Sequence, residues 1–224
     1  MTHYITVART ATLALVVAAL AGCGLNSVNG SVSVAAGSKQ GDVGTVNGSV
    51  SVGEGATVDG AMTVNGSVKL DARAVAKSVK TVNGEITLAS SAKVSEDVHT
   101  VNGGLKLENG ADVGGGIANV NGDISLASAH VGGGIVTVNG DIDVMGTSRV
   151  DGGIHVEHSD GDTGKHLPRI VIGPGATVNG KLVFDRPVKL YVSETATVPG
   201  PIEGATPQKF SGDHPTEVET AAAN

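Results

Sequence analysis

The side chains of this sequence that are best suited to chemistry lie close together in one polar stretch. It contains His155, Glu157, His158, Asp160, Asp162 and His166. Imidazole and carboxylate groups are ligands that Zn²⁺ and other transition metals accept, so one interpretation is a metal or ligand site. The spacing matches no established ligand pattern, and loops are polar in general. The favoured interpretation is therefore a solvated loop, and no cofactor is expected.

A second candidate is Cys23, the only cysteine, which cannot form a disulfide within the chain. Before it, a short polar start with Arg9 precedes an apolar run over 11–21, too short to span a bilayer as a mature helix. The run ends in Leu-Ala-Gly-Cys over 20–23, which resembles the lipobox of bacterial lipoproteins. A generic signal peptide with an incidental cysteine is the alternative interpretation.

The lipobox resemblance implies a processing pathway and a location. Residues 1–22 would be a signal peptide removed before Cys23, and 23–27 would be a lipidated linker. Acylation of the Cys23 sulfur and of the new amino terminus would supply more than one acyl chain, which is what stable anchoring requires. Gly24 stands where an aspartate would retain such a protein at the inner membrane, so the resemblance implies the outer membrane.

The elements that position these groups are set by a repeated motif, Val-Asn-Gly. Its copies follow one another at intervals of 18 or 19 residues. Periods of about 20 residues indicate stacked units, each unable to bury its apolar face alone. The motif valines are Val28, Val46, Val64, Val82, Val101, Val120 and Val138.

Within one repeat, apolar residues come in pairs two apart, and the pairs recur every six residues. Val50 and Val52 are followed by Ala56 and Val58, for example. Period two predicts strands, and the reset every six residues predicts that each strand is short and followed by a turn. The fold is thus expected to be all-β: a single-stranded, three-sided parallel β-solenoid over 28–210. We expect about 18 residues per coil and roughly nine coils, forming a rod on the order of 40 Å long. A right-handed winding is favoured.

The corner chemistry agrees with this fold. Asn-Gly is a strong turn pair because both residues tolerate positive φ. Repeated once per coil, it predicts a column of asparagines whose amides form hydrogen bonds along the axis. The predicted ladder consists of Asn29, Asn47, Asn65, Asn83, Asn102, Asn121 and Asn139.

The third side, which leads into the motif valine, keeps the six-residue phase least well. Val79, Val98, Ile117 and Ile135 stand one place early, which indicates a bend or bulge. The residues before the motif valines are expected to face outward in single file. Such a file can match an ice lattice, but β propensity with contacts between hydroxyls is the favoured interpretation. The file consists of Thr45, Thr63, Thr81, Thr100, Asn119 and Thr137.

The pattern changes after Val150. A polar insertion is predicted at 157–168, after which the six-residue phase returns. The Val-Asn-Gly at 178–180 follows Gly-Ala-Thr, so it matches the second side and not the ladder corner. A short cap containing Ile202 and Phe210 is expected, followed by a disordered tail over 211–224. His99 and His130, single histidines on the repeats, are expected at the surface.

The chain from roughly Val28 to Phe210 resembles the bacterial polymer-forming β-solenoids of the bactofilin type. It is also similar to adhesin-type β-strand-repeat proteins, many of them lipoproteins. The matching segments are the Val-Asn-Gly units and the intervening Gly-Ala-x-Val units. This resemblance implies a right-handed parallel β-solenoid. Bactofilins lack a lipobox, so the sequence over 20–23 departs from their pattern.

The net charge of −7 disfavours nucleic-acid binding and a polybasic contact with lipid headgroups. Membrane attachment would therefore come from the lipid. We expect a non-enzymatic, lipid-anchored protein of the bacterial cell envelope. It would act as a scaffold, a spacer or an adhesin-like surface that binds an envelope polymer or protein. One alternative is a bactofilin-like filament formed by self-association. The other is a β-helix enzyme, either an acyltransferase or a polysaccharide lyase.

Overall fold

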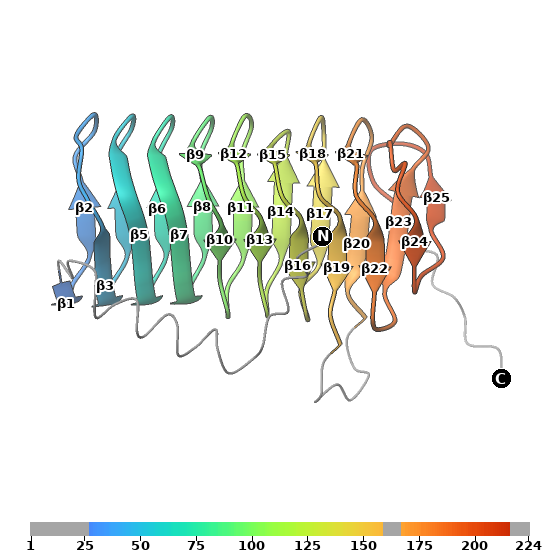
Figure 1. Ribbon diagram of the computed structural model, residues 1–224, viewed down its shortest axis with the longest axis horizontal. Helices are drawn as coiled ribbons and strands as arrows, with labels where there is room; N and C mark the ends of the chain where they lie inside the picture. Colours follow the sequence, from blue (N-terminus) through green and yellow to red (C-terminus); the bar gives the residue numbers. More distant parts are fainter. Residues whose placement is uncertain (1–26, 159–166, 216–224) are drawn as a thin grey trace, which may run out of the picture.

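The chain winds into a parallel β-solenoid of about ten turns (Figure 1). The computed structural model describes residues 27–158 and 167–215. Strands pair with their equivalents one coil away, as Val50 does with Val68 at a spacing of 18 residues. The all-β, three-sided fold is therefore confirmed over these ranges. They contain no helix long and apolar enough to cross a membrane. The predicted signal peptide and Cys23 lie outside them.

The first side of the solenoid is a ten-stranded sheet, with one strand from every coil. Except in the last coil, each strand turns two aliphatic side chains toward the core, which explains the period-two pattern. Its strands are β2 (Val32–Val34), β4 (Val50–Val52), β6 (Val68–Leu70), β8 (Ile86–Leu88), β11 (Leu105–Leu107), β14 (Ile124–Ala127), β17 (Ile142–Met145), β20 (Arg169–Ile172), β23 (Lys189–Ser193) and β25 (Gln208–Phe210).

The other two sides belong to one 15-stranded sheet that branches. They are joined where β5 (Thr57–Asn65) and β7 (Val75–Asn83) run through both sides without a break. Side two continues as β9 (Lys93–Val94), β12 (Asp112–Val113), β15 (His130–Val131), β18 (Arg149–Val150) and β21 (Thr177–Val178). Side three consists of β1 (Ser27–Asn29), β3 (Val43–Asn47), β10 (Val98–His99), β13 (Ile117–Ala118), β16 (Ile135–Thr137), β19 (Ile154–Val156), β22 (Leu182–Phe184) and β24 (Ile202–Glu203).

The core is a narrow column, mainly of Val, Ile, Leu and Ala, that runs along the axis and includes Phe184. Leu70, Ile86 and Leu88 are fully buried in it, on neighbouring coils of side one. Because a coil only one strand wide on each side leaves little interior space, small and branched aliphatic side chains fill most of it. Each coil completes its core by packing on the coils before and after it, which accounts for the dependence on stacking.

The expected C-terminal cap is a further coil of the solenoid. Ile202 lies in β24 and pairs with Leu182, and Phe210 lies in β25 and pairs with Ser193. The stack therefore has about ten coils where the sequence predicted nine. Phe210 belongs to a small cluster with Val171 and Tyr191, separate from the main core. Of the expected tail, the structure describes 211–215.

The file of threonines predicted to face outward is instead buried, so that prediction is wrong. On β7 the early residue Val79 faces the core, and Thr81, two places further on, must face it too. The motif valine then falls on the other side of the strand, where its exposure varies: Val28 in the first coil is 57% exposed, whereas Val82 and Val138 are 5% exposed. The buried set is Thr45, Thr63, Thr81, Thr100, Asn119 and Thr137, so this file cannot match an ice lattice.

The Asn-Gly corner depends on close approach between coils, and its asparagines do not have positive φ. The non-glycine residues with positive φ among those described are Arg73, Ser91 and Ser128, none of them in the ladder. At the corner, a Cβ built on Gly84 would overlap the backbone carbonyl of Gly66 in the preceding coil. Glycine is thus needed because two backbones touch, and asparagine is needed for its side chain.

Gly84→Ala should destabilise the solenoid, because the new methyl group would overlap the backbone of the preceding coil. We expect a loss of about 1–3 kcal/mol, as for other overpacked sites. The matched control is Gly41→Ala, where the nearest atom to a Cβ is Asp59 Oδ2 at 3.9 Å. Thermal unfolding followed by circular dichroism tests the pair. Equal midpoints for the two variants would contradict the proposed backbone contact.

Candidate functional site

The seven motif asparagines form one continuous column at the corner between sides three and one. Each Nδ2 donates to the Oδ1 of the asparagine one coil earlier, and all six of these bonds measure 2.9 Å. They run from Asn47 to Asn29 at the first step and from Asn139 to Asn121 at the last. The predicted ladder is therefore present over its full length.

A second set of axial bonds lies just inside this ladder. Thr45 Oγ1 donates to the carbonyl oxygen of Gly30 at 2.8 Å, and Thr63 does the same to Gly48. The equivalent bond of Thr81 to Gly66 is 3.0 Å. The buried hydroxyl thus pairs with a carbonyl that the tight corner turns inward. This partner explains why a polar residue can occupy the core side of the strand.

The C-terminal end of the ladder is capped by an arginine. Arg186 lies in the turn after β22, is 5% exposed, and donates from Nη1 to the Oδ1 of Asn139. The same nitrogen donates to the carbonyl oxygen of Val138 at 3.0 Å. The intervening coil carries the polar insertion at this corner and supplies no asparagine. The guanidinium therefore reaches across that coil and closes the amide column.

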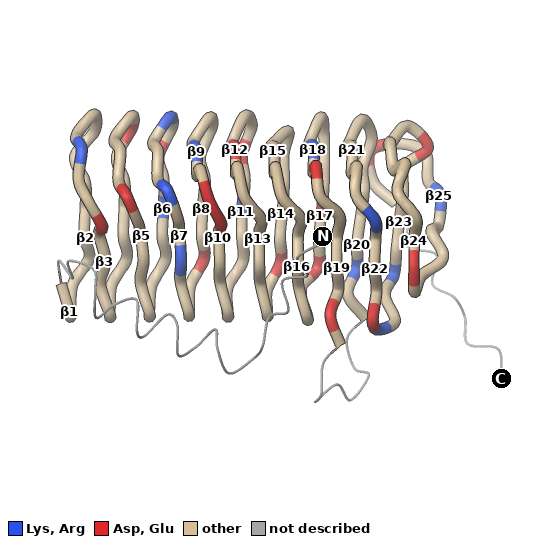
Figure 2. The backbone as a smooth tube through the Cα atoms, in the orientation of Figure 1, with Lys and Arg blue, Asp and Glu red and all other residues tan. Residues whose placement is uncertain are grey.

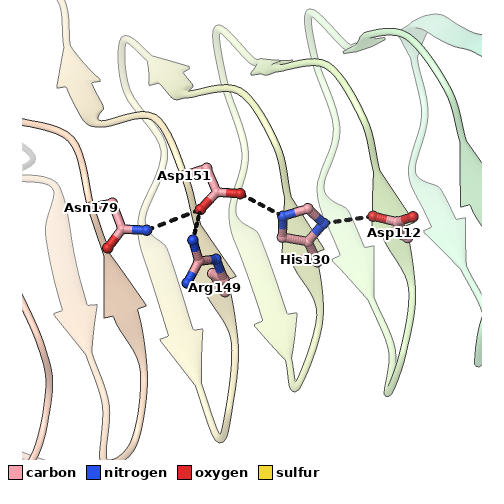
Figure 3. Close-up of polar contacts among 5 residues, drawn as sticks. All are labelled: Asp112, His130, Arg149, Asp151 and Asn179. Atoms are coloured by element: carbon pink, nitrogen blue, oxygen red, sulfur yellow. Dashed lines mark hydrogen bonds and ion pairs between the residues drawn. The ribbon is translucent and has the colours of Figure 1, made fainter.

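A polar network on the outer face of side two links four coils (Figure 3). His130 Nδ1 lies 2.7 Å from Asp112 Oδ1, and Nε2 lies 2.9 Å from Asp151 Oδ2. Asp151 also pairs with Arg149 at 2.5 Å and accepts from Asn179 Nδ2 at 2.9 Å. The network therefore connects β12, β15 and β18 with the turn after β21.

His130 on side two and His99 on side three have opposite electrostatic surroundings. Hydrogen bonds that the ring donates to Asp151 and then to Asp112 raise the pKa of His130. The same contacts, with His130 first and Arg149 second, lower the pKa of Asp151 to about 2. For His99 on β10, burial lowers the pKa, since Asp97 at 3.9 Å offsets the desolvation only in part. His130 favours the charged imidazolium, whereas His99 favours the neutral ring.

The structure describes three of the six candidate ligands in and beside the insertion, and the other three lie outside the described residues. His155 lies on β19 with its Nε2 2.6 Å from Asp185 Oδ2, on the next coil. Glu157 is half-buried, and His158 is exposed. Asp160, Asp162 and His166 lie outside the described residues. Within 27–158 and 167–215, no group of three or more His, Cys, Asp or Glu side chains is placed to hold a metal ion.

An open depression of about 710 Å³ lies at the corner between sides three and one, near the C-terminal end. It is lined by residues 184–188 and 204–206, which form the corner turns of two successive coils. Charged residues of both signs are scattered along the rod (Figure 2). Several of the ion pairs join adjacent coils, as Lys77 and Asp59 do at 2.6 Å.

The class of protein that this geometry defines is a parallel β-solenoid with an axial asparagine ladder. Its polar side chains repeatedly bind their neighbours one coil away. Comparisons with protein-family models, with curated proteins and with solved structures give no significant match for this chain.

Two parts of this site were missed in the sequence. The sequence indicates only a single surface histidine at His130, although the outward positions of side two bring oppositely charged groups together when the repeats are aligned. These positions are Lys93, Asp112, His130 and Arg149, partners in the strand register. Arg186 could not be assigned by alignment of repeats, because the insertion separates its corner from the seven before it.

Asn83→Ala should destabilise the solenoid, because it removes the amide bonds to both Asn65 and Asn102. At about 0.5–1.5 kcal/mol per bond, we expect a loss of roughly 1–3 kcal/mol. The control is Asn29→Ala at the end of the ladder, for which one such bond is recorded. Thermal midpoints should fall about twice as far for Asn83→Ala. A larger effect at Asn29 would show that the ladder does not act as a column.

Arg186→Ala should cost about 1–3 kcal/mol, because it leaves the carbonyl of Val138 and the amide of Asn139 without this donor. Lys181→Ala is the control: its exposed ion pair with Glu203 at 3.7 Å should contribute at most about 1 kcal/mol. Urea unfolding of both variants provides the comparison. If Arg186→Ala unfolds at the wild-type midpoint, the arginine does not cap the ladder.

Proposed function

We propose that the protein is a rigid, lipid-anchored spacer or scaffold of the bacterial cell envelope. The observation that carries this proposal is the uninterrupted ladder from Asn29 to Asn139. A column of identical side-chain bonds parallel to the strand ladders resists bending and stretching along the rod. Mechanical stiffness is the property to which the repeated side chains contribute most directly.

The anchor is inferred from the sequence over 20–23. Three residues separate Cys23 from Ser27, where β1 begins. At no more than about 3.6 Å per residue, the lipid would lie within roughly 15 Å of the first coil. An acyl group at that position would hold one end of the rod at the membrane, and the far coils would extend into the envelope. The rod could then set a distance or present its faces to an envelope polymer or protein.

A self-assembling filament is the second candidate. The observation that favours it is that, within 27–158 and 167–215, β2 and β25 each pair with one strand, so the described first side has a strand edge at each end of the stack. Such edges can pair with those of another copy. The resemblance to polymer-forming β-solenoids of the bactofilin type supports the same candidate. Lipid at one end would limit growth there, so we rank the anchored spacer first.

Cys23→Ala should abolish lipidation and leave an uncleaved precursor, because no other cysteine can accept the acyl chain. We expect the wild type to partition into the detergent phase of Triton X-114. After globomycin treatment, the wild type should migrate as the precursor does. Ser27→Ala, outside the lipobox, is the matched control. If neither migration nor partition changes in Cys23→Ala, the anchored proposal fails and the filament becomes the better candidate.

A further inference from the structure

Two different kinds of side-chain bond hold neighbouring coils together along the rod. From Asn29 to Asn139 the bonds are between neutral amides. Beyond Asn139, in the C-terminal coils from β17 to β25, the side-chain contacts between coils involve carboxylates instead. Arg169 pairs with Asp143 at 3.1 Å, His155 lies 2.6 Å from Asp185, and Asn179 donates to Asp151 at 2.9 Å. The ladder part also has ion pairs, such as Lys77 with Asp59, but those side chains are mostly exposed.

His130 lies across the boundary between these two parts. Its partner Asp112 belongs to a coil of the ladder part, whereas Asp151 follows β18 in the C-terminal coils. Asp151 also accepts a hydrogen bond from Asn179, one coil further on. The network thus spans the place where the amide ladder ends and the insertion leaves the solenoid.

The geometry at His130 requires a particular protonation state. Both ring nitrogens lie within hydrogen-bond distance of a carboxylate oxygen, at 2.7 and 2.9 Å. A carboxylate can only accept, so both nitrogens must carry a proton, as they do in imidazolium. The neutral ring has one N–H, and its other nitrogen would place a lone pair against a carboxylate oxygen. Loss of one proton therefore breaks one of the two links.

The charged groups around the ring favour the imidazolium on balance. Asp112 faces it from β12, and Asp151 faces it from the turn after β18. Arg149 is its register partner on β18, but that guanidinium is paired with Asp151. Lys93 on β9 is the register partner of Asp112. Two carboxylates thus contact the ring directly, and the two cations lie beside those carboxylates.

We propose that His130 is a pH-dependent fastener between the amide-laddered coils and the C-terminal coils. When the imidazolium loses a proton, the coils from β17 to β25 open more readily, whereas the coils between β2 and β11 keep their protection. The device lies in the fold itself and does not depend on the proposed lipid anchor.

The direction of the pH effect follows from linkage. The contacts raise the folded-state pKa of His130, so its contribution is fully present below the unfolded value of about 6.5. It is lost as pH rises through the folded-state pKa. With its pKa lowered to about 2, Asp151 stays ionised over this range. The side chains are about two-fifths exposed or less, so we expect the modest effect of a partly screened pair.

Amide hydrogen exchange between pH 5.5 and 8.5, at fixed ionic strength, tests the proposal on the full chain. After correction for intrinsic rates, peptides covering β18 to β22 should lose about two- to fivefold in protection as pH rises. Peptides covering β4 to β8 should not change. An NMR titration of the His130 ring supplies the pKa, and the midpoint of the exchange profile should coincide with it.

His130→Gln should remove the pH dependence, and the controls His99→Gln and His155→Gln should keep it. If His130→Gln does not fold, Asp112→Asn serves instead, because it leaves the contact with Asp151 in place. That variant should move both the ring pKa and the exchange midpoint to lower pH. The proposal is overturned if the C-terminal peptides show no pH dependence, or if His130→Gln retains it.

Discussion

Everything in this molecule depends on equivalent residues stacking at the spacing of parallel strands. A coil has too small an interior to be stable alone, so each side chain must find a partner in its own copy one turn away. The constraint acts at once on the aliphatic core, the Asn29–Asn139 column and the touching corner glycines. It also explains why the repeat tolerates steps of 18 or 19 residues but keeps its motif unchanged.

Three residues of a corner, Thr81, Asn83 and Gly84 for example, each have a distinct physical role. The threonine hydroxyl binds a corner carbonyl from inside, and the asparagine amide binds its equivalents along the outer edge. The glycine lets the two backbones meet. A short motif is therefore enough to define one corner, since the remaining residues of a coil need only alternate between apolar and polar.

The period, the three sides and the ladder could be predicted because they follow from spacing and residue type. The orientation of Thr81 could not be predicted. The early residue Val79 reverses the inward and outward positions between itself and the corner, and the extent of that reversal depends on tertiary packing. The two partners of His130 come from the coils before and after its own, so they emerge only when the repeats are aligned. Arg186 reaches past a whole coil, and no local pattern encodes that.

The stacking of like on like also bears on how such a rod changes during evolution. Each coil contacts its neighbours through the same surfaces, so gain or loss of one coil-length segment leaves no mismatched junction. Recombination between the near-identical stretches around Asn47 and Asn65 would lengthen or shorten the rod by one strand spacing, about 4.8 Å. Reach is thus adjustable in discrete steps, and the ends and the insertion can be inherited unaltered while the middle varies.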